Sequence, residues 1–508
     1  MRRKQLAAAL AVATATSLLV APQASAAPAQ TIAWRACFSE VPPGAPPGAE
    51  RLECGTFTAP MDWNHPNNGK TVTIAVSRLT PKDGKAKSTV FTNPGGPGGE
   101  GRTMPLLFAE RQKLADNAEI IGIDVRGTGA SSNVTCGDYF TLPSTDPRDR
   151  SRANLDLLYD GMALQAKFCQ TKSGELGRYI TTDQTVKDLD LLRQLLGRKK
   201  VSWLGYSGGS WLGAYYATYF PKTLDKVVLD SNAEFTAPWQ AVFGDWGMGF
   251  ERRLRVDFLP WVAKYDSVYH LGKTADEVWQ TYERTRRKLN EQPVTLPEGV
   301  YNGVLLDFVT RAGLYQKGAF DGTATKIAEL AGAAPRRMSA QATYPDASIG
   351  TLFSVLCNDT PFRGGRTHLE RDAVRDGARW PFFGYYQLAG PCAFWDRPNV
   401  TLKQPTGKGV VPTLMVQSVR DPATPLEGAQ RAHRGFRNSV MLTVEDEGDH
   451  GIYGFGNACV NDVVERYLVD GVTPAKDLTC PGVPLPAPGE TVQNPLTKAR
   501  QLATDLGW

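Results

Sequence analysis

The segment Gly205-Tyr206-Ser207-Gly208-Gly209 holds the residue most suited to nucleophilic chemistry. It matches G-x-S-x-G, in which a serine sits on a sharp turn between a strand and a helix and exposes its hydroxyl. Glycines flank such a turn because a side chain there would clash. The β-like run 201–204 precedes the serine, and a helical pattern over 210–220 follows it. We therefore predict that Ser207 is a nucleophile.

A serine nucleophile of this kind needs a histidine as its base. In proteins built around a G-x-S-x-G turn, this histidine follows the serine in the chain. His450 lies in Glu447-Gly448-Asp449-His450-Gly451, directly after a predicted strand, and its glycine neighbours suit a loop at a sheet edge. We predict His450 as the base, with an unperturbed pKa near ~6.5. The other histidines fit less well, because they precede the serine, fall in a helical insertion or lie in an arginine-rich helix: His65, His270, His368 and His433.

The acid that orients the base is expected between the serine and the histidine. Asp421 follows the predicted strand 413–417, and Pro422 biases it toward an extended conformation. The alternative is Asp449, but neighbouring side chains in an extended loop diverge, so Asp449 is expected to cap a turn instead. We predict Asp421 as the acid.

Two backbone N–H groups are needed to stabilise the oxyanion of an acyl transfer. Gly208 would supply one, and the loop Asn93-Pro94-Gly95-Gly96-Pro97-Gly98-Gly99 would supply the other through Gly96. Proline has no N–H, so Pro94 and Pro97 can only shape this loop. The loop lacks G-x-x-x-x-G-K-[ST], which argues against a phosphate site.

Short apolar runs that alternate with helical patterns must position these residues. Apolar runs lie at 89–91, 120–123, 201–204 and 227–229, and again at 413–417 and 440–444. Residues 71–79 alternate as a strand, in a hairpin that spans Cys54 to Leu79. Helical patterns cover 184–196 and 462–469. This alternation predicts an α/β fold with a mostly parallel central sheet and helices on both faces.

The pattern changes between residues 234 and 396, which are rich in Trp, Arg and helical spacing. We interpret this stretch as a mainly helical cap inserted into the core, over the strand ends. The expected organisation is a signal peptide at 1–26, core at 27–233, cap at 234–396 and core again at 397–508.

Residues 1–26 have the features of a secretory signal: a basic start, an apolar run over 6–20 and Ala24-Ser25-Ala26 as a cleavage site. The apolar run is short for a bilayer span. We expect a secreted, extracellular protein without a membrane anchor.

Eight cysteines lie beyond this signal, and an even count in an exported chain favours disulfides. Pairing of neighbours is the simplest of many connectivities: 37–54, 136–169, 357–392 and 459–480. Neither a C-x-x-C motif nor a close Cys/His cluster occurs, so we predict neither a metal nor another cofactor. A net charge of +5 over 508 residues, with no dense basic stripe, also argues against nucleic acid as a partner.

Several of these motifs together resemble one known family. The glycine-rich loop at 94–98, Asp124-Val125-Arg126-Gly127-Thr128-Gly129-Ala130-Ser131, the Ser207 segment, 421–425 and 448–451 are similar to segments of prolyl aminopeptidases. The whole chain resembles the secreted tripeptidyl aminopeptidases of actinobacteria such as Streptomyces, within the α/β-hydrolase superfamily. Asn93-Pro94 departs from the plain prolyl aminopeptidases, which carry a histidine before the two glycines, and favours the tripeptidyl branch.

The resemblance implies a serine exopeptidase that releases N-terminal tripeptides, or tetrapeptides, with a preference for proline before the scissile bond in some relatives. Peptides with a free N-terminus would be its partners, and we expect a monomer. A free α-ammonium needs a paired negative charge when it is desolvated. Candidates in the cap are Asp359, Asp245 and Glu251, although each could equally be a structural or surface charge.

Two other functions use the same motifs. A secreted carboxylesterase would carry the same triad and differ only in the cap. A non-catalytic binding module on a hydrolase scaffold would have a damaged triad, yet all three residues are present.

Overall fold

The protein is described by a computed structural model that covers residues 30–137, 145–296, 299–332 and 345–490. The predicted signal peptide at 1–26 lies outside these residues. From Ile32 onward the chain forms one compact unit. Within the described ranges, no helix is long and apolar enough to cross a membrane.

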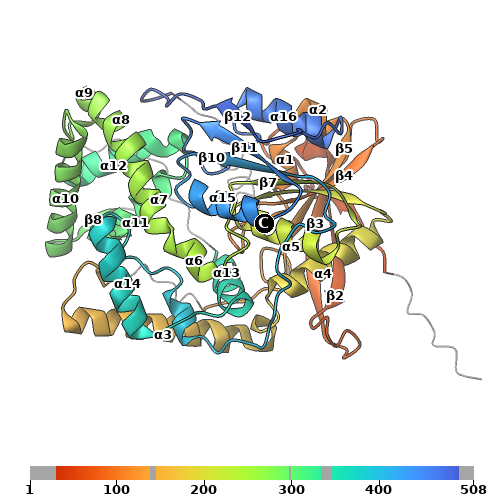
Figure 1. Cartoon of the computed structure of the whole chain (residues 1–508), viewed down its shortest axis with the longest axis horizontal. Helices are drawn as coiled ribbons and strands as arrows, with labels where there is room; N and C mark the ends of the chain where they lie inside the picture. The colour runs from red at the N-terminus through yellow and green to blue at the C-terminus, as the bar shows by residue number, and fades with distance from the viewer. Residues whose placement is uncertain (1–29, 138–144, 297–298, 333–344, 491–508) are drawn as a thin grey trace, which may run out of the picture. The chain divides into compact units, whose positions relative to one another are not determined.

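One large sheet organises the described part of the chain (Figure 1). Its spatial order is β1-β2-β3-β5-β4-β6-β7-β10-β11-β12. The strands from β5 to β12 in this order run parallel, whereas β1, β2 and β3 add antiparallel pairs at one edge. The bounds are β1 Arg35–Ala36, β2 Leu52–Pro60, β3 Thr71–Leu79, β4 Ser88–Asn93, β5 Ala118–Asp124, β6 Val201–Tyr206, β7 Leu224–Asp230, β10 Thr413–Ser418, β11 Ser439–Glu445 and β12 Leu478–Pro481.

The central strands are covered on both faces, as their apolar runs predict. Every residue of β5, β6 and β10 is buried. Successive residues alternate between two hydrophobic clusters: Val90, Leu204 and Val228 belong to one cluster, and their neighbours Phe91, Trp203 and Val227 belong to the other. This alternation is what a strand with two covered faces produces, so the predicted α/β architecture is confirmed.

Different helices cover the two faces. One cluster includes side chains of α4 (Thr182–Leu195), α5 (Gly208–Tyr219) and α15 (Leu426–Gly435). The other includes side chains of α1 (Met104–Leu107), α2 (Gln112–Ala115) and α16 (Ala458–Leu468). The long helix α3 (Arg152–Gly177) contacts α13 (Asp346–Asp359). The expectation of helices on both faces is thus confirmed.

The segment between β7 and β10 is mainly helical, with one small hairpin of β8 and β9. Much of it surrounds a third hydrophobic cluster that includes Phe250, Leu306 and Phe383, whereas α13 packs into a cluster of the sheet. In Figure 1 the helices α8 to α12 gather beside the sheet. The elements are α6 Trp239–Gly244, α7 Trp246–Arg253, η2 Leu254–Phe258, α8 Leu259–Lys264, α9 Asp266–Tyr269, α10 Ala275–Glu291, β8 Val294–Leu296, β9 Gly299–Tyr301, α11 Gly303–Gly313, η3 Lys317–Ala319, α12 Phe320–Ala331, α13 Asp346–Asp359, α14 Arg366–Arg379 and η4 Gly390–Phe394.

Four disulfides link the cysteines as neighbours in sequence, which confirms the simplest predicted pairing. They are Cys37–Cys54, Cys136–Cys169, Cys357–Cys392 and Cys459–Cys480. Such bonds fit an oxidising, extracellular environment.

Candidate active site

Ser207 occupies the turn between β6 and α5, as the sequence predicts. Its backbone has φ 56° and ψ −122°, a conformation that non-glycine residues rarely adopt. Hydrogen bonds hold it there: Ser207 N–H donates to the carbonyl of Asp230 at 3.0 Å, and Ser210 N–H donates to the carbonyl of Ser207 at 2.8 Å. The turn places the serine at the carboxyl end of a central strand.

The glycines beside Ser207 are required by the packing of the turn. A Cβ on Gly205 would lie 2.3 Å from the carbonyl oxygen of Gly209. A Cβ on Gly209 would lie 2.7 Å from the carbonyl oxygen of Asn93. Both distances are far below van der Waals contact, so the steric argument made from the sequence is confirmed.

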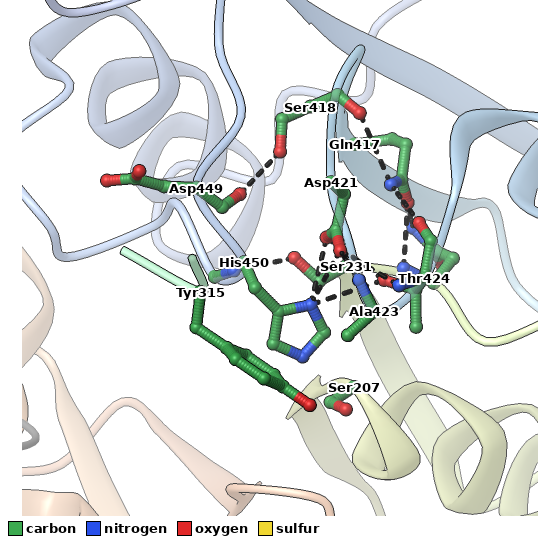
Figure 2. Close-up of polar contacts among 12 residues, drawn as sticks. Ser207, Ser231, Tyr315, Gln417, Ser418, Asp421, Ala423, Thr424, Asp449 and His450 are labelled. Atoms are coloured by element: carbon green, nitrogen blue, oxygen red, sulfur yellow. Dashed lines mark hydrogen bonds and ion pairs between the residues drawn. The ribbon is translucent and has the colours of Figure 1, made fainter. Parts of the chain in front are cut away.

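His450 and Asp421, which lie 29 residues apart, meet at the ends of neighbouring strands (Figure 2). The His450 Nδ1 atom lies 2.9 Å from both carboxylate oxygens of Asp421. The N–H groups of Ala423 and Thr424 donate to Asp421 Oδ1 at 2.9 and 2.8 Å, and the Thr424 hydroxyl donates to Oδ2 at 3.0 Å. Asp421 is fully buried, so its carboxylate is held as a fixed hydrogen-bond acceptor for the imidazole.

The second nitrogen of the His450 ring points toward Ser207 in Figure 2. Burial by itself lowers the pKa of His450, but the Asp421 carboxylate outweighs it, and Asp230 adds to the effect, so the pKa rises above its ordinary value. A base of this kind can take a proton from a serine hydroxyl and then be stabilised as an imidazolium by the carboxylate.

Asp449, the alternative acid, faces away from the imidazole (Figure 2). Its carboxylate accepts hydrogen bonds from Arg253 Nη2 at 2.6 Å and from Lys317 N–H at 2.7 Å. Asp449 therefore belongs to an ion-pair network and does not cap a turn as we expected. The reason is that Arg253 and Lys317 of the inserted segment lie beside it in the folded chain.

The glycine-rich loop lies against the turn that carries Ser207. A Cβ on Gly208 would lie 3.0 Å from the carbonyl carbon of Gly96. The N–H of Gly95 already donates to Asn93 Oδ1 at 2.9 Å. The N–H of Gly95 is thus engaged, whereas Gly96 lies against Gly208, the other residue predicted as an oxyanion donor.

Three parts of the inserted segment contact the loops of the site. A Cβ on Gly249 of α7 would lie 2.2 Å from the carbonyl oxygen of Pro422, next to Asp421. A Cβ on Gly98 would lie 2.5 Å from the carbonyl oxygen of Ser348 on α13. The third contact is between Tyr315 and the backbone of His450. The insertion thus borders the loop that carries Asp421, the glycine-rich loop and the loop that carries His450.

Residues 315–317 run alongside residues 447–450, the segment that carries His450. The sequence contained no signal for this contact. His450 N–H donates to the carbonyl of Tyr315 at 2.9 Å, and the amide of Gln316 donates to the carbonyl of His450. The Tyr315 ring meets the imidazole edge to face, with the centroids 5.3 Å apart. Lys317 Nζ donates to Glu447 Oε2 at 2.6 Å. The insertion therefore fixes the backbone on both sides of His450.

The junction after β7 links the serine turn to the histidine loop. The backbone carbonyl of Asp230 holds Ser207, while its carboxylate accepts the N–H groups of Ile452 and Tyr453 at 3.2 and 2.8 Å. Gly451 N–H donates to the Ser231 hydroxyl at 2.7 Å. Burial raises the pKa of Asp230 to about 6.

Comparison with known proteins places this arrangement in a family. Residues 380–480 match the family model described as TAP-like protein. A protein of Streptomyces lividans named tripeptidyl aminopeptidase is 34% identical over 461 residues, which cover 86% of this chain and 85% of that protein. The chain belongs to the tripeptidyl aminopeptidase family. This peptidase is a serine hydrolase of the α/β-hydrolase fold.

The chain is also similar to more distant proteins. Serine protease Hip1 of Mycobacterium tuberculosis is 24% identical to the peptidase over 491 residues, covering 89% of this chain and 91% of that protein. The solved structure of a proline iminopeptidase from Mycobacterium smegmatis aligns with 82% of this chain and 98% of its own, at 14% identity and a TM-score of 0.37.

The three cap carboxylates singled out in the sequence all have internal partners in the peptidase. Asp359 accepts the N–H and hydroxyl of Thr182 at 2.8 and 2.6 Å. Glu251 accepts the N–H of Phe382 and the guanidinium of Arg255, both at 2.8 Å. Asp245 pairs with Arg431 at 2.7 Å and keeps 31% of its side chain exposed, while the other two are buried. Among the described residues, none of the three forms a hydrogen bond or ion pair with the side chain of Ser207 or His450.

Proposed function

We propose that this peptidase releases tripeptides, or tetrapeptides, from the free N-terminus of peptides, with Ser207, His450 and Asp421 as its triad. The contact between His450 Nδ1 and the buried Asp421 carboxylate, with the second ring nitrogen toward Ser207, is the observation that carries this proposal. The family membership supports the peptide substrate.

In this mechanism His450 takes the hydroxyl proton of Ser207 while Oγ attacks the carbonyl carbon of the scissile bond. The N–H groups of Gly96 and Gly208 stabilise the oxyanion of the tetrahedral intermediate. His450 then gives its proton to the leaving amine, and the N-terminal segment stays bound to Ser207 as an ester. Water, deprotonated by His450, attacks that ester, releases the segment as an acid and restores the serine.

The inserted segment, for which we retain the boundaries 234–396, would act as a cap that measures the substrate from its N-terminus. Among the three candidate partners of the α-ammonium, Asp245 fits best because its side chain is partly exposed. Burial raises the pKa of Asp245, and nearby Glu234 and Glu427 raise it further despite Arg431. A cationic ligand would relieve this excess of negative charge.

Peptides of matched sequence with free, acetylated and one-residue-extended N-termini test the proposal. We expect products cut after the third residue of the free peptide, and at least about tenfold lower kcat/KM for the acetylated one, because its ammonium charge is absent. Mass spectrometry of the products reads the fragment length, and a set that varies the third residue reads any preference for proline. Equal turnover of free and blocked peptides would overturn the exopeptidase proposal.

The alternative, a carboxylesterase, uses the same triad, since an ester and an amide pass through the same kind of oxyanion. A Mycobacterium tuberculosis protein named carboxylesterase B is 25% identical over 465 residues. Short acyl esters assayed beside the tripeptide substrates separate the two: efficient ester hydrolysis with no peptide cleavage would favour the esterase.

Export of the enzyme is part of the proposal. The predicted signal at 1–26 and the four disulfides support it. Expression of the full chain in an actinobacterial host, followed by N-terminal sequencing of the protein in the medium, tests for a mature chain that begins near Ala27. Size-exclusion chromatography with light scattering tests the expected monomer.

A further inference from the structure

Arg311, in the last turn of α11, holds its guanidinium among aromatic side chains of the inserted segment. Its Cζ atom lies between 5.4 and 5.7 Å from five ring centroids, those of Trp246, Phe250, Phe308, Tyr315 and Phe383. Cation–π attraction stabilises a cation in such a position. The rings supply no in-plane hydrogen-bond acceptors for the five N–H groups of a guanidinium.

Within the described residues, Arg311 has no carboxylate partner. Its one hydrogen bond is a long one from Nη1 to the Tyr315 hydroxyl at 3.5 Å, and its Nε is buried without a partner. Arg255 shows the usual arrangement: its guanidinium lies 4.0 Å from the Trp279 ring and also pairs with Glu251 at 2.8 Å. Since arginine stays charged in proteins, Arg311 carries an uncompensated positive charge in apolar surroundings.

The acids nearest to Arg311 in the sequence and packing are already engaged. Asp307, one helical turn earlier on α11, accepts hydrogen bonds from Tyr282, Arg286 and Tyr386 at 2.6, 2.8 and 2.7 Å. It also pairs with Arg148. Glu251 uses both of its oxygens on other groups. Neither of these acids is therefore free to complete the site, and no carboxylate of the described residues pairs with Arg311.

The site adjoins the proposed catalytic residues through Tyr315. The Tyr315 ring packs against the imidazole of His450 at 5.3 Å, and its hydroxyl points toward Ser207 in Figure 2. Arg311 Nη1 lies 3.5 Å from the same hydroxyl. An extended peptide advances about 3.3 Å per residue, so we expect Arg311 to face a substrate residue one to three positions from the scissile bond.

We propose that Arg311 and its five aromatic neighbours form a subsite for a carboxylate of the peptide substrate. The carboxylate belongs to an Asp or Glu side chain or to the C-terminus of a short peptide. The aromatic walls lower the polarity around the half-buried guanidinium and so strengthen its ion pair with a carboxylate. The inference rests on the proposed peptidase function and adds to it a preference for negative charge.

Neutral carbonyl groups of the substrate are the competing occupants, because they also accept hydrogen bonds from a guanidinium. They would leave its charge uncompensated. Substitution of Glu by Gln in the substrate separates the two possibilities, since the shape and the acceptor are kept and only the charge is lost.

The experiment measures kcat/KM of the full-length enzyme on free-amine peptides in which each of three positions before and two after the scissile bond is Glu or Gln in turn. A second set compares free and amidated C-termini on short peptides. We expect a preference of about 10- to 100-fold for the charged member at one position, the range typical of a hydrogen bond to a charged group. The set in which it occurs identifies the source of the carboxylate.

Arg311→Met keeps the length and the aromatic packing but removes the charge. It should abolish the preference, with a smaller loss of turnover on the Gln peptide than on the Glu peptide, because Gln loses only a hydrogen bond and Glu also loses an ion pair; Arg311→Lys should retain part of the preference. Arg255→Met is the matched control, and it should keep the full preference because Arg255 already has a carboxylate. Circular dichroism and melting curves check that each variant is folded.

A wild-type enzyme without any preference for the charged member of the pairs would overturn the proposal, with no variant needed. A preference that survives in folded Arg311→Met would also overturn it. Equal cleavage of acetylated and free peptides would instead refute the exopeptidase function, while the Glu and Gln comparison could still be read on the acetylated substrates.

Discussion

Asn substitutions at Asp421 and Asp449 separate the two aspartates that could serve His450. In Asp421→Asn, the N–H groups of Ala423 and Thr424 that now donate to Oδ1 fix the amide oxygen at that position. The amide NH₂ then takes the place of Oδ2, 2.9 Å from His450 Nδ1. The amide then offers Nδ1 a donor beside the remaining oxygen, which is also 2.9 Å away but carries no charge. Asn therefore no longer holds the proton on Nδ1, and the tautomer with its proton on the nitrogen nearest Ser207, which cannot act as a base, gains population.

The expected loss in kcat is about 10³- to 10⁴-fold, the scale known for this change in serine hydrolases, or about 4–5 kcal/mol in transition-state free energy at ~1.36 kcal/mol per tenfold. The melting temperature should change little, since shape and backbone hydrogen bonds are retained. In this variant, kcat/KM on a tripeptide substrate should fall by a larger factor than the affinity of the enzyme for a product peptide.

Asp449→Asn is the matched control. It removes one of three carboxylates from a buried network in which Asp257, Glu447 and Asp449 face Arg253 and Lys317. The amide oxygen can still accept a hydrogen bond, so we expect a loss of about 1–3 kcal/mol in unfolding free energy. Turnover should fall less than about tenfold.

Steady-state kinetics on a free-amine tripeptide substrate and urea unfolding read the two effects separately. If Asp421→Asn kept a tenth or more of the wild-type kcat, Asp421 would not be the acid. The same conclusion would follow if Asp449→Asn were the variant that lost 10³-fold.

Three further predictions follow from the geometry. Because the pKa of His450 is raised and only its neutral form accepts a proton, kcat/KM should fall with decreasing pH around a midpoint above 6.5; a flat profile between pH 5 and 8 would exclude His450 as the base. Gly209→Ala should lower kcat at least about tenfold by shifting the serine turn, because its Cβ would lie 2.7 Å from the carbonyl oxygen of Asn93; wild-type kcat in the folded variant would contradict the steric argument. Replacing both Cys136 and Cys169 by Ser opens a bridge across 33 residues and should lower the unfolding free energy by about 2–4 kcal/mol in urea titrations, with unchanged stability as the contrary result.

The sequence predicted the core because its signals are local. Strands such as β3 and β6 are short apolar or alternating runs, and the predicted strand 71–79 matches β3 residue for residue. The glycines around Ser207 predict a turn that only small residues permit. Each cysteine pairs with its neighbour in sequence, so even the simplest assumption about the disulfides was confirmed. The order of Ser207, Asp421 and His450 follows from where parallel strands end.

The sequence by itself therefore determined the fold class and predicted the meeting of His450 with Asp421 near Ser207, whereas the pairing of the cysteines was one of many possibilities until the structure decided it. Only the tertiary structure decided what surrounds them. The contact of Tyr315 with His450 and the pairing of Asp449 with Arg253 join residues more than 130 positions apart. Helical periodicity in the insertion shows which face is apolar, but which helix meets which loop depends on packing between distant segments. For the same reason the sequence does not show that Arg311 lacks a carboxylate partner among the described residues, because this depends on which side chains surround it in the folded protein.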